Sequence, residues 1–235
     1  MIFFFFFNSQ NYYQQDFSCK HERKIGGIGE GAKWVCDPHR IPRSQSTYEH
    51  LVLNGQRNQN SVENPSRCLV YSIGNKGNMQ FEYGLRDIIG KQVCEIHIFD
   101  SPQYIESYKL LIGLQDEFVF FHPWTLKGSK QSSIQTKGDF KTFQETVRLL
   151  GHRDRIIDIL KIDCEGCEWD TYKDWLYTKV TIMQILVQLH GNPRHPHDFF
   201  HKLHYHNYVT FHKEASTMFK GAEYSFIKLA PEFFS

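Results

Sequence analysis

The sequence predicts an α/β domain built on a seven-stranded, mostly parallel sheet that closes with an antiparallel hairpin. From Cys68 onward, apolar runs of strand length alternate with segments whose apolar residues recur at helical spacing, which is typical of a parallel sheet covered on both faces. The last two apolar runs are joined by a polar connection too short for a crossover helix, so they should pair antiparallel. A length of 235 residues, 40% hydrophobic content and the lack of an internal repeat suit one such domain.

The expected strands are short apolar runs bounded by glycine or polar residues. They span residues 68–73, 93–99, 117–121, 156–162, 182–189, 207–212 and 223–229. The helices between them are recognised by apolar stripes, which lie within residues 81–89, 104–111, 140–150, 169–176 and 199–203. We expect Asp139 to cap the third of these helices and Gly151 to end it.

The first 32 residues are expected to form a flexible extension, and residues 33–235 the folded domain. The extension ends in a glycine-rich stretch at residues 26–31 and begins with the apolar run Met1–Phe7. That run is shorter than the roughly 20 residues that a membrane span needs. It fits either a disordered start or the remnant of a truncated signal anchor, so the sequence leaves the compartment open between the cytoplasm and the secretory pathway.

Composition narrows the class of partner. The chain has 27 Lys and Arg against 26 Asp and Glu, and this balance argues against a dedicated nucleic-acid binder. No segment is long and apolar enough to span a membrane. The expected partner is therefore a small molecule, and the oligomeric state is left undetermined.

The six cysteines allow more than one interpretation. Cys68 and Cys94 lie inside expected strands, where small buried thiols are the simplest interpretation, although an even number is also compatible with disulfides. Cys164 and Cys167 form a C-x-x-C spacing that fits redox chemistry or half of a zinc site, but no second C-x-x-C accompanies it.

A glycine turn follows the first strand and predicts a ligand with an adenosine-like part. Gly74 ends the strand, where a side chain would block the close approach of a ligand, and a helix pattern follows. Asp100 ends the next strand and is placed to bind ribose hydroxyls. The other residues of this turn that are expected to contact the ligand are Ser72, Asn75 and Gly77. A plain tight turn is the alternative.

Acidic residues and a histidine follow the fourth and fifth strands. Asp163 and Glu165 should face the cleft, because ligands of open α/β sheets lie beyond the carboxyl ends of the strands. They suit a general base, a metal ligand or a ligand clamp. The alternative is a helix N-cap at Asp163, with Glu165 and Glu168 favoured by the helix dipole. His190 ends the fifth strand and should face the pocket for the second substrate, as a catalytic or substrate-binding residue. The alternative is a structural histidine.

Weaker candidates lie elsewhere. Trp124 follows the third strand and could either stack on a ligand or simply pack in its loop. Glu82 and Asp37 are weaker polar candidates near the opening of the same expected ligand site. His197 and His201 would be one helical turn apart and could share a metal ion, but no H-E-x-x-H pattern surrounds them. We therefore predict no metal.

Two segments carry a resemblance to a known family. Leu69–Glu82 and Ile159–Trp169, together with shorter pieces in the same order and spacing, resemble the methyltransferase-like family related to FkbM methyltransferases. The shorter pieces are Lys33–Pro38, His122–Trp124, Ile185–His190 and Glu223–Leu229. The resemblance spans roughly residues 33–229 and implies a class I, Rossmann-like methyltransferase fold, which the closing hairpin also matches. Cysteine at positions 164 and 167 departs from the family, where small or aliphatic residues are commoner.

The resemblance implies S-adenosylmethionine as methyl donor. It assigns Gly74 and Asp100 to the cofactor, and Asp163 and Glu165 to the cleft. The resulting prediction is an S-adenosylmethionine-dependent methyltransferase that O-methylates a sugar or another small hydroxyl-bearing acceptor. The predicted catalytic residues are Asp163, His190 and Glu165, and the predicted cofactor-binding residues are Ser72, Gly74, Asn75, Gly77, Glu82, Asp100, Trp124 and Asp163. The alternatives are an inactive binding protein of the same fold and a nicotinamide-dependent oxidoreductase, although the latter lacks its G-x-G-x-x-G signature here.

Overall fold

A seven-stranded sheet forms the centre of the molecule, with strand order β10-β11-β9-β8-β3-β4-β5. The computed structural model describes residues 13–29, 31–41, 67–91, 93–112, 118–129, 139–191, 196–215 and 221–234. The sheet strands are β3 (Cys68–Ile73), β4 (Cys94–Phe99), β5 (Val119–His122), β8 (Ile157–Ile162), β9 (Ile182–His190), β10 (Tyr208–Ala215) and β11 (Gly221–Lys228). Strands β5, β4, β3, β8 and β9 are parallel, and β11 runs antiparallel to both β9 and β10. The predicted fold class is confirmed.

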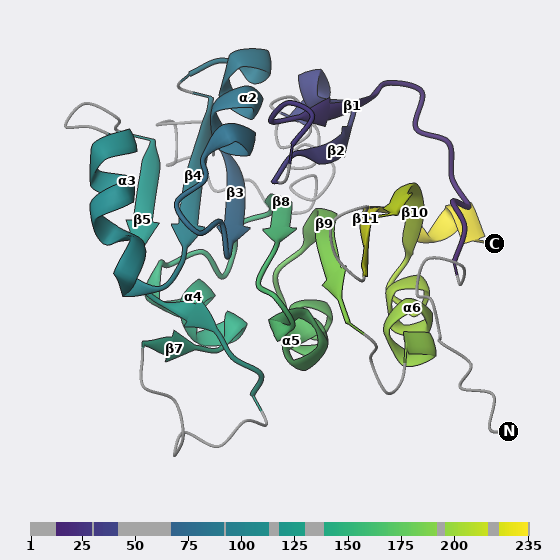
Figure 1. The fold of residues 1–235 in the computed structure, drawn as a ribbon. Coiled ribbons are helices and arrows are strands. Elements are labelled where there is room, and N and C mark those ends of the chain that lie inside the picture. Colours follow the sequence, from purple (N-terminus) through teal and green to yellow (C-terminus); the bar gives the residue numbers. More distant parts are fainter. Residues whose placement is uncertain are drawn as a thin grey trace, which may run out of the picture.

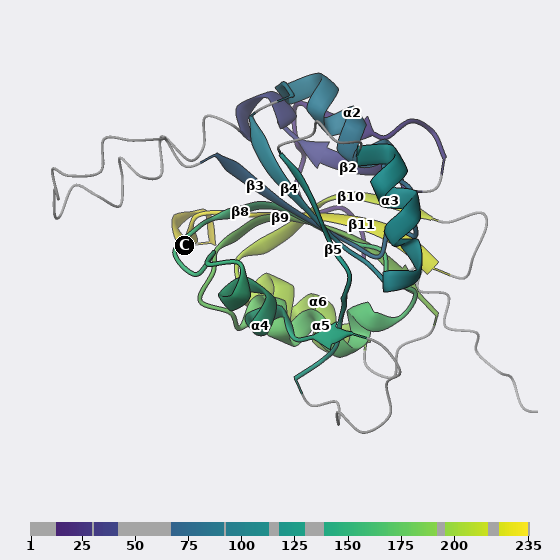
Figure 2. The ribbon, with the colours of Figure 1, turned by 90° about the vertical axis from the view of Figure 1, so that its left-hand side faces the viewer.

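Helices cover both faces of this sheet, as Figures 1 and 2 show. One face carries α2 (Gln80–Ile89) and α3 (Ile105–Ile112), and the other carries α4 (Phe143–Leu149), α5 (Cys167–Leu176) and α6 (Pro196–Tyr205). Neighbouring residues of a strand point to opposite faces, so β3 sends Val70 to the apolar cluster under α2 and Tyr71 to the cluster under α4 to α6. The strand is buried throughout, which explains its unbroken apolar run.

Helix α4 begins later than predicted. Its N-cap is Thr142, whose hydroxyl accepts from the Glu145 backbone N–H while the Glu145 side chain accepts from the Thr142 N–H. This reciprocal capping box satisfies two backbone donors at once. Phe140, predicted to be helical, instead lies in β7 (Phe140–Lys141), which pairs with β6 (Thr125–Leu126). The prediction that Asp139 caps this helix was therefore wrong.

An N-terminal ribbon packs against the domain. Strands β1 (Glu22–Ile25) and β2 (Lys33–Cys36) pair antiparallel, and the backbone N–H groups of Asp16 and Phe17 donate to the Thr210 carbonyl. Part of the expected extension thus packs on the domain, whereas Ile28 in its glycine-rich end is exposed. The boundary expected after residue 32 falls inside this ribbon. The run Met1–Phe7 lies outside the described residues.

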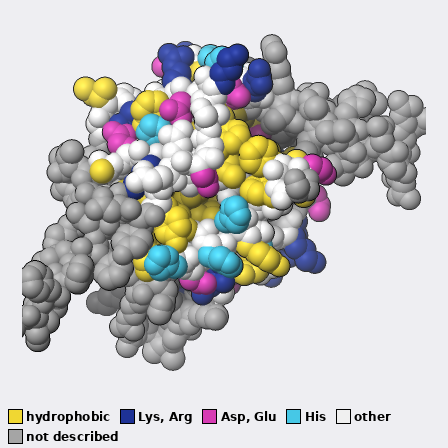
Figure 3. Space-filling model, turned by 90° about the vertical axis from the view of Figure 1, so that its right-hand side faces the viewer, with side chains coloured by type: hydrophobic (Ala, Val, Ile, Leu, Met, Phe, Trp, Pro, Cys, Tyr) yellow, Lys and Arg dark blue, Asp and Glu magenta, His cyan; other side chains and the backbone are white. Residues whose placement is uncertain are grey.

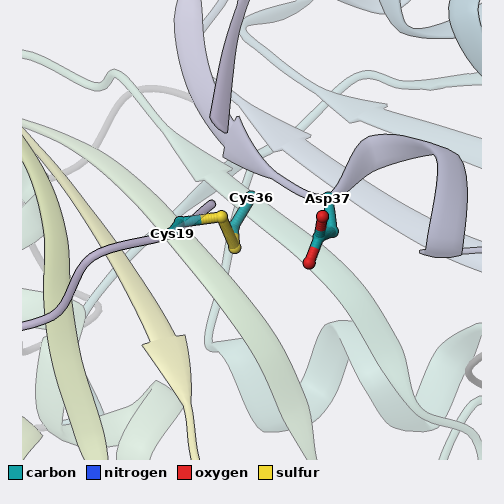
Figure 4. Close-up of side chains that lie close together, drawn as sticks. All are labelled: Cys19, Cys36 and Asp37. Carbon is teal, nitrogen blue, oxygen red and sulfur yellow. A yellow bond between two sulfur atoms is a disulfide. The ribbon is translucent and has the colours of Figure 1, made fainter. Parts of the chain in front are cut away.

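All six cysteines form disulfides, the possibility that their even number left open. Cys68 and Cys94 are therefore not the buried thiols favoured for these two positions. Cys68 and Cys94 are register partners on β3 and β4, with Cα atoms 4.5 Å apart, which is within reach of a bridge. Figure 4 shows the Cys19–Cys36 disulfide beside Asp37. Because both sulfur atoms are bonded to each other, this group offers no thiolate for a metal ion.

Short 3-10 helices complete the described structure. They span Pro38–Arg40, Pro102–Tyr104 and Pro231–Phe234. Within the described ranges, none of the helices has the length and apolar character needed to cross a bilayer.

Candidate active site

The carboxyl ends of four neighbouring strands bring most of the predicted site residues together. Figure 1 shows the arrowheads of β3, β8 and β9 directed toward the same edge of the sheet. The turn after β3 and the segment after β8 are in direct contact, since the Asp163 N–H donates to the Ile73 carbonyl at 2.9 Å. This is the edge at which open α/β sheets bind ligands.

Gly74 packs against protein backbone. Its φ of 79° lies in the left-handed region, and a Cβ there would sit 2.2 Å from the Asp163 carbonyl oxygen. Its N–H donates to the Phe99 carbonyl at 3.0 Å. The structure therefore gives a reason for this glycine that the sequence did not: close packing of two backbone segments, whatever the residue contributes to a ligand.

Asp100 holds the glycine turn in place. One oxygen, Oδ2, accepts from the Lys76 N–H at 2.5 Å and from the Tyr108 hydroxyl at 2.9 Å, and Oδ1 accepts from the Ser101 N–H at 2.8 Å. The Tyr108 hydroxyl also accepts from the Gly77 N–H at 3.0 Å. Burial raises the pKa of Asp100, although these donors act in the opposite direction.

Ser72, Asn75 and Glu82 form one buried polar group with Lys161. Glu82 Oε1 accepts from Ser72 Oγ at 2.5 Å and from Asn75 Nδ2 at 2.7 Å. Lys161 Nζ donates to Asn75 Oδ1 at 2.6 Å, and burial lowers the pKa of this lysine. Glu82 Oε2 is buried and accepts no hydrogen bond from the described residues. Three predicted cofactor residues therefore lie together, with one carboxylate oxygen still able to accept.

On the other half of the edge, His190 lies between two carboxylates. Its Nδ1 is 3.1 Å from Glu168 Oε1, and its Nε2 is 3.9 Å from Asp163 Oδ1. Glu168 is fully buried and also accepts from the His190 and Gly166 backbone N–H groups. Trp169 Nε1 donates to the His190 carbonyl at 2.7 Å. The predicted pair Asp163 and His190 is thus close in space, and Glu168 positions the histidine.

Lys33 connects the N-terminal ribbon to this half of the site, and the sequence analysis did not assign it a role. Its side chain is 1% exposed, with Nζ 2.8 Å from Glu223 Oε1, 3.2 Å from Gln188 Oε1 and 3.6 Å from Asp163 Oδ2. A lysine next to the apolar run of β2 was a usable signal, and the same holds for Lys161 among the isoleucine and leucine residues of β8. Glu168 and Glu223 gave no comparable signal.

Two predicted residues lie at the margin of the site. Glu165, in a left-handed conformation, is exposed and pairs with Lys76 of the glycine turn. Trp124 donates from Nε1 to Thr146 Oγ1 at 3.2 Å, and its ring packs beside those of Phe99 and His122. These contacts match the alternative of a packed loop aromatic.

The late histidines do not form a metal cluster with other ligand residues in the described structure. His197, His201 and His204 are exposed on α6, and Figure 3 shows histidine side chains on the face that carries β10 and α6. The Tyr13 hydroxyl lies 2.6 Å from His197 Nδ1. The groups of three or more metal-ligating residues found in the described ranges contain neither His197 nor His201.

Comparison with known proteins decides the family. A profile of the family described as "Methyltransferase domain" matches residues 3–228, which is nearly the whole chain. The chain belongs to this family. No curated protein matches it.

Solved structures similar to this methyltransferase domain include three with distant sequences. Fibrillarin from Aeropyrum pernix, in complex with S-adenosyl-L-methionine, is 13% identical over 94% of this chain and 86% of its own, with a TM-score of 0.47. Methyltransferase FkbM from Methylobacillus flagellatus KT is 12% identical over 78% of this chain and 50% of its own, with a TM-score of 0.45. Precorrin-6y C5,15-methyltransferase from Geobacter metallireducens GS-15 is 9% identical over 69% of this chain and 80% of its own, with a TM-score of 0.43. The family assignment rests on the profile match and not on these likenesses.

Proposed function

We propose that this methyltransferase domain uses S-adenosylmethionine and methylates a hydroxyl group of a sugar or another small acceptor, as expected of an FkbM-like enzyme. The observation that carries the proposal is the placement of His190 between Asp163 and Glu168, at the same sheet edge as the glycine turn and Asp100. One half of the edge then holds the cofactor and the other half receives the acceptor.

The residues of β3, β4 and α2 fit the cofactor. In this proposal Asp100, which directly follows β4, would bind the ribose hydroxyls. Glu82 Oε2 is a buried acceptor that a donor group of the ligand would satisfy. When bound, S-adenosylmethionine supplies an electrophilic methyl group on a sulfonium centre. Lys76, paired with Glu165, connects the glycine turn to the segment after β8 at the exposed margin of the site.

His190 is suited to remove the acceptor proton. Donation from its Nδ1–H to Glu168 places the acceptor lone pair on Nε2, the nitrogen that faces Asp163. His190 Nε2 would accept the proton of the acceptor hydroxyl, whose oxygen would take the methyl group as the methyl–sulfur bond of the sulfonium breaks. The carboxylates of Asp163 and Glu168 then stabilise the imidazolium, and Lys33 fixes Asp163 from the ribbon side.

The three disulfides bear on the compartment. Disulfides form and persist in oxidising compartments. They therefore support the secretory-pathway alternative over the cytoplasmic one.

The test has two parts. Calorimetry with S-adenosylmethionine, S-adenosylhomocysteine and NAD, run in parallel, should show binding of the first two only. Transfer of a labelled methyl group is then measured on a panel of sugars, other small hydroxylated molecules and RNA. Binding of NAD alone would support the oxidoreductase alternative, and cofactor binding without transfer to any acceptor would support the inactive one. Labelling of RNA would contradict the small-molecule acceptor.

A further inference from the structure

A second cluster of ligand-type side chains lies away from the sheet edge, on the face of β4 that packs under α4. Glu95 and His97 lie two residues apart on β4, and His152 follows α4. One ligand atom of each lies within 4.8 Å of the ligand atoms of the other two. Both histidines are more than nine-tenths buried. Imidazole is the commonest metal ligand among protein side chains.

One nitrogen of this cluster has no hydrogen-bond partner among the described residues. His97 Nε2 is buried, makes no hydrogen bond among the described residues, and lies 3.9 Å from Glu95 Oε2. A buried imidazole nitrogen without a partner is costly and calls for an explanation. A tetrahedral ion with bonds of about 2.0–2.1 Å separates its ligand atoms by about 3.3–3.4 Å. Small side-chain movements would bring the two atoms to that spacing.

The outer contacts resemble those that orient metal-bound histidines. His97 Nδ1 is 2.9 Å from His122 Nε2, and the two rings are nearly parallel, at 6°. The Tyr71 hydroxyl is 2.8 Å from His152 Nδ1. Such partners fix the ring orientation and the tautomer of ligating imidazoles. Tyr71 and His122 therefore hold the two rings of the cluster in place.

We propose that Glu95, His97 and His152 form a binding site for a divalent transition-metal ion, with Zn²⁺ as the best match to two imidazoles and one carboxylate. Arg155 competes for this site, because its guanidinium pairs with Glu95 Oε2 while its other terminal nitrogen donates to the Arg67 carbonyl at 2.7 Å. The metal ion must displace or share that carboxylate oxygen. The site is separate from the candidate active site, which lies at the carboxyl ends of the strands.

The experiment uses the full chain with its disulfides intact, stripped with a chelator. Zn²⁺ binding is measured by calorimetry, and Co²⁺ binding by visible absorption, which reports a low-symmetry site of nitrogen and oxygen ligands. The variants are His97→Gln, His152→Gln and Arg155→Gln. His201→Gln, on the exposed surface of α6, controls for binding by the histidine-rich surface.

We expect one Zn²⁺ equivalent that is lost in His97→Gln and His152→Gln and kept in His201→Gln. Arg155→Gln should bind the ion about tenfold more tightly, since the competing cation is gone. If the histidine variants do not fold, Tyr71→Phe serves instead, and its loss of an outer partner should weaken binding about 10- to 100-fold. Zinc binding that survives in the histidine variants, that has unchanged affinity in Tyr71→Phe, that disappears in His201→Gln, or that is weaker in Arg155→Gln would overturn the proposal.

Discussion

The two halves of the candidate active site differ in how their polar groups are satisfied. At the ends of β3 and β4, Asp100 accepts three hydrogen bonds from the protein, and Ser72, Asn75 and Glu82 bond to one another. At the ends of β8 and β9, Asp163 lies 3.6 Å from Lys33 and 3.9 Å from His190, and both Asp163 and His190 keep 18% of their side chains exposed.

We interpret the first half as a scaffold and the second half as the reactive group of the proposed mechanism. The first half is held by short, buried bonds, so its residues set the shape of the glycine turn before any ligand arrives. The second half keeps longer, partly exposed charge contacts that can rearrange as a proton moves. Substitutions in the first half should therefore affect folding or cofactor affinity, whereas substitutions in the second half should affect turnover.

Gly74→Val should give the largest effect, and it tests the scaffold directly. The new Cβ would meet the Asp163 carbonyl at 2.2 Å. A left-handed conformation costs an L-residue about 1–2 kcal/mol, and overpacking costs about 1–3 kcal/mol. We expect the free energy of unfolding in urea to fall by about 2–5 kcal/mol.

Gly29→Ala is the matched control, because a Cβ there meets nothing within 4 Å. The contrary outcome is a Gly74→Val protein that has normal stability but does not bind S-adenosylhomocysteine. It would support the role predicted from the sequence, in which Gly74 contacts the ligand.

His190→Gln should lower turnover by about 10²–10⁴-fold, the usual contribution of a general base, and leave cofactor affinity unchanged. Asp163→Asn should act in the same direction, because Asp163 faces His190 Nε2. Labelled methyl transfer measures the first quantity and calorimetry the second. Full turnover in both variants would remove the pair from the mechanism and leave proximity as the source of catalysis.

Asp100→Asn should weaken cofactor binding roughly tenfold to a hundredfold, since charge-assisted hydrogen bonds are worth about 1.5–3 kcal/mol. Its amide cannot accept from Lys76, Ser101 and Tyr108 as the carboxylate does. Glu106→Gln, on the exposed surface of α3, is the control. An unchanged dissociation constant for S-adenosylhomocysteine would exclude the ribose role.

Lys161→Met tests the buried polar group through pH. Burial holds the folded-state pKa of Lys161 below its unfolded value of about 10.4, so wild-type stability is lowest where the lysine must be charged. As pH rises toward about 10, the wild type should gain stability relative to Lys161→Met. The exposed Lys109→Met variant should show no such trend. A difference that does not change with pH would contradict the assigned direction.

Replacing Cys164 and Cys167 by serine should have the smallest effect on stability. The two cysteines are three residues apart, and the chain-entropy relation gives about 1.5 kcal/mol for so short a loop. The same relation gives about 3.5 kcal/mol for Cys68 and Cys94, 26 residues apart. Thermal unfolding of the two double variants compares them. A larger loss at positions 164 and 167 would show that this disulfide shapes the segment around Glu165.

The strands of the central sheet, its closing hairpin and the sheet edge that carries the candidate site could be predicted from the sequence. These features follow from local periodicity and from the parallel topology that it implies, and the structure places β3 at Cys68–Ile73 as predicted. The start of the third predicted helix was misread because two local structures compete there. Phe140 fits a helical stripe, but it pairs with Thr125 in a short strand and leaves Thr142 to cap the helix.

Contacts between residues far apart in the sequence could not be predicted in this way, because they depend on how the strands assemble. Lys33 reaches Asp163 because the ribbon packs over β9 and β11, Cys68 pairs with Cys94 because β3 and β4 are in register, and His97 approaches His152 because α4 returns to the start of β8. Such contacts depend on strand order and register, which no short stretch of sequence encodes. A charged residue expected to be buried indicates that it has a partner, because burying an unpaired charge costs too much free energy. Which residue is that partner depends on the assembled sheet.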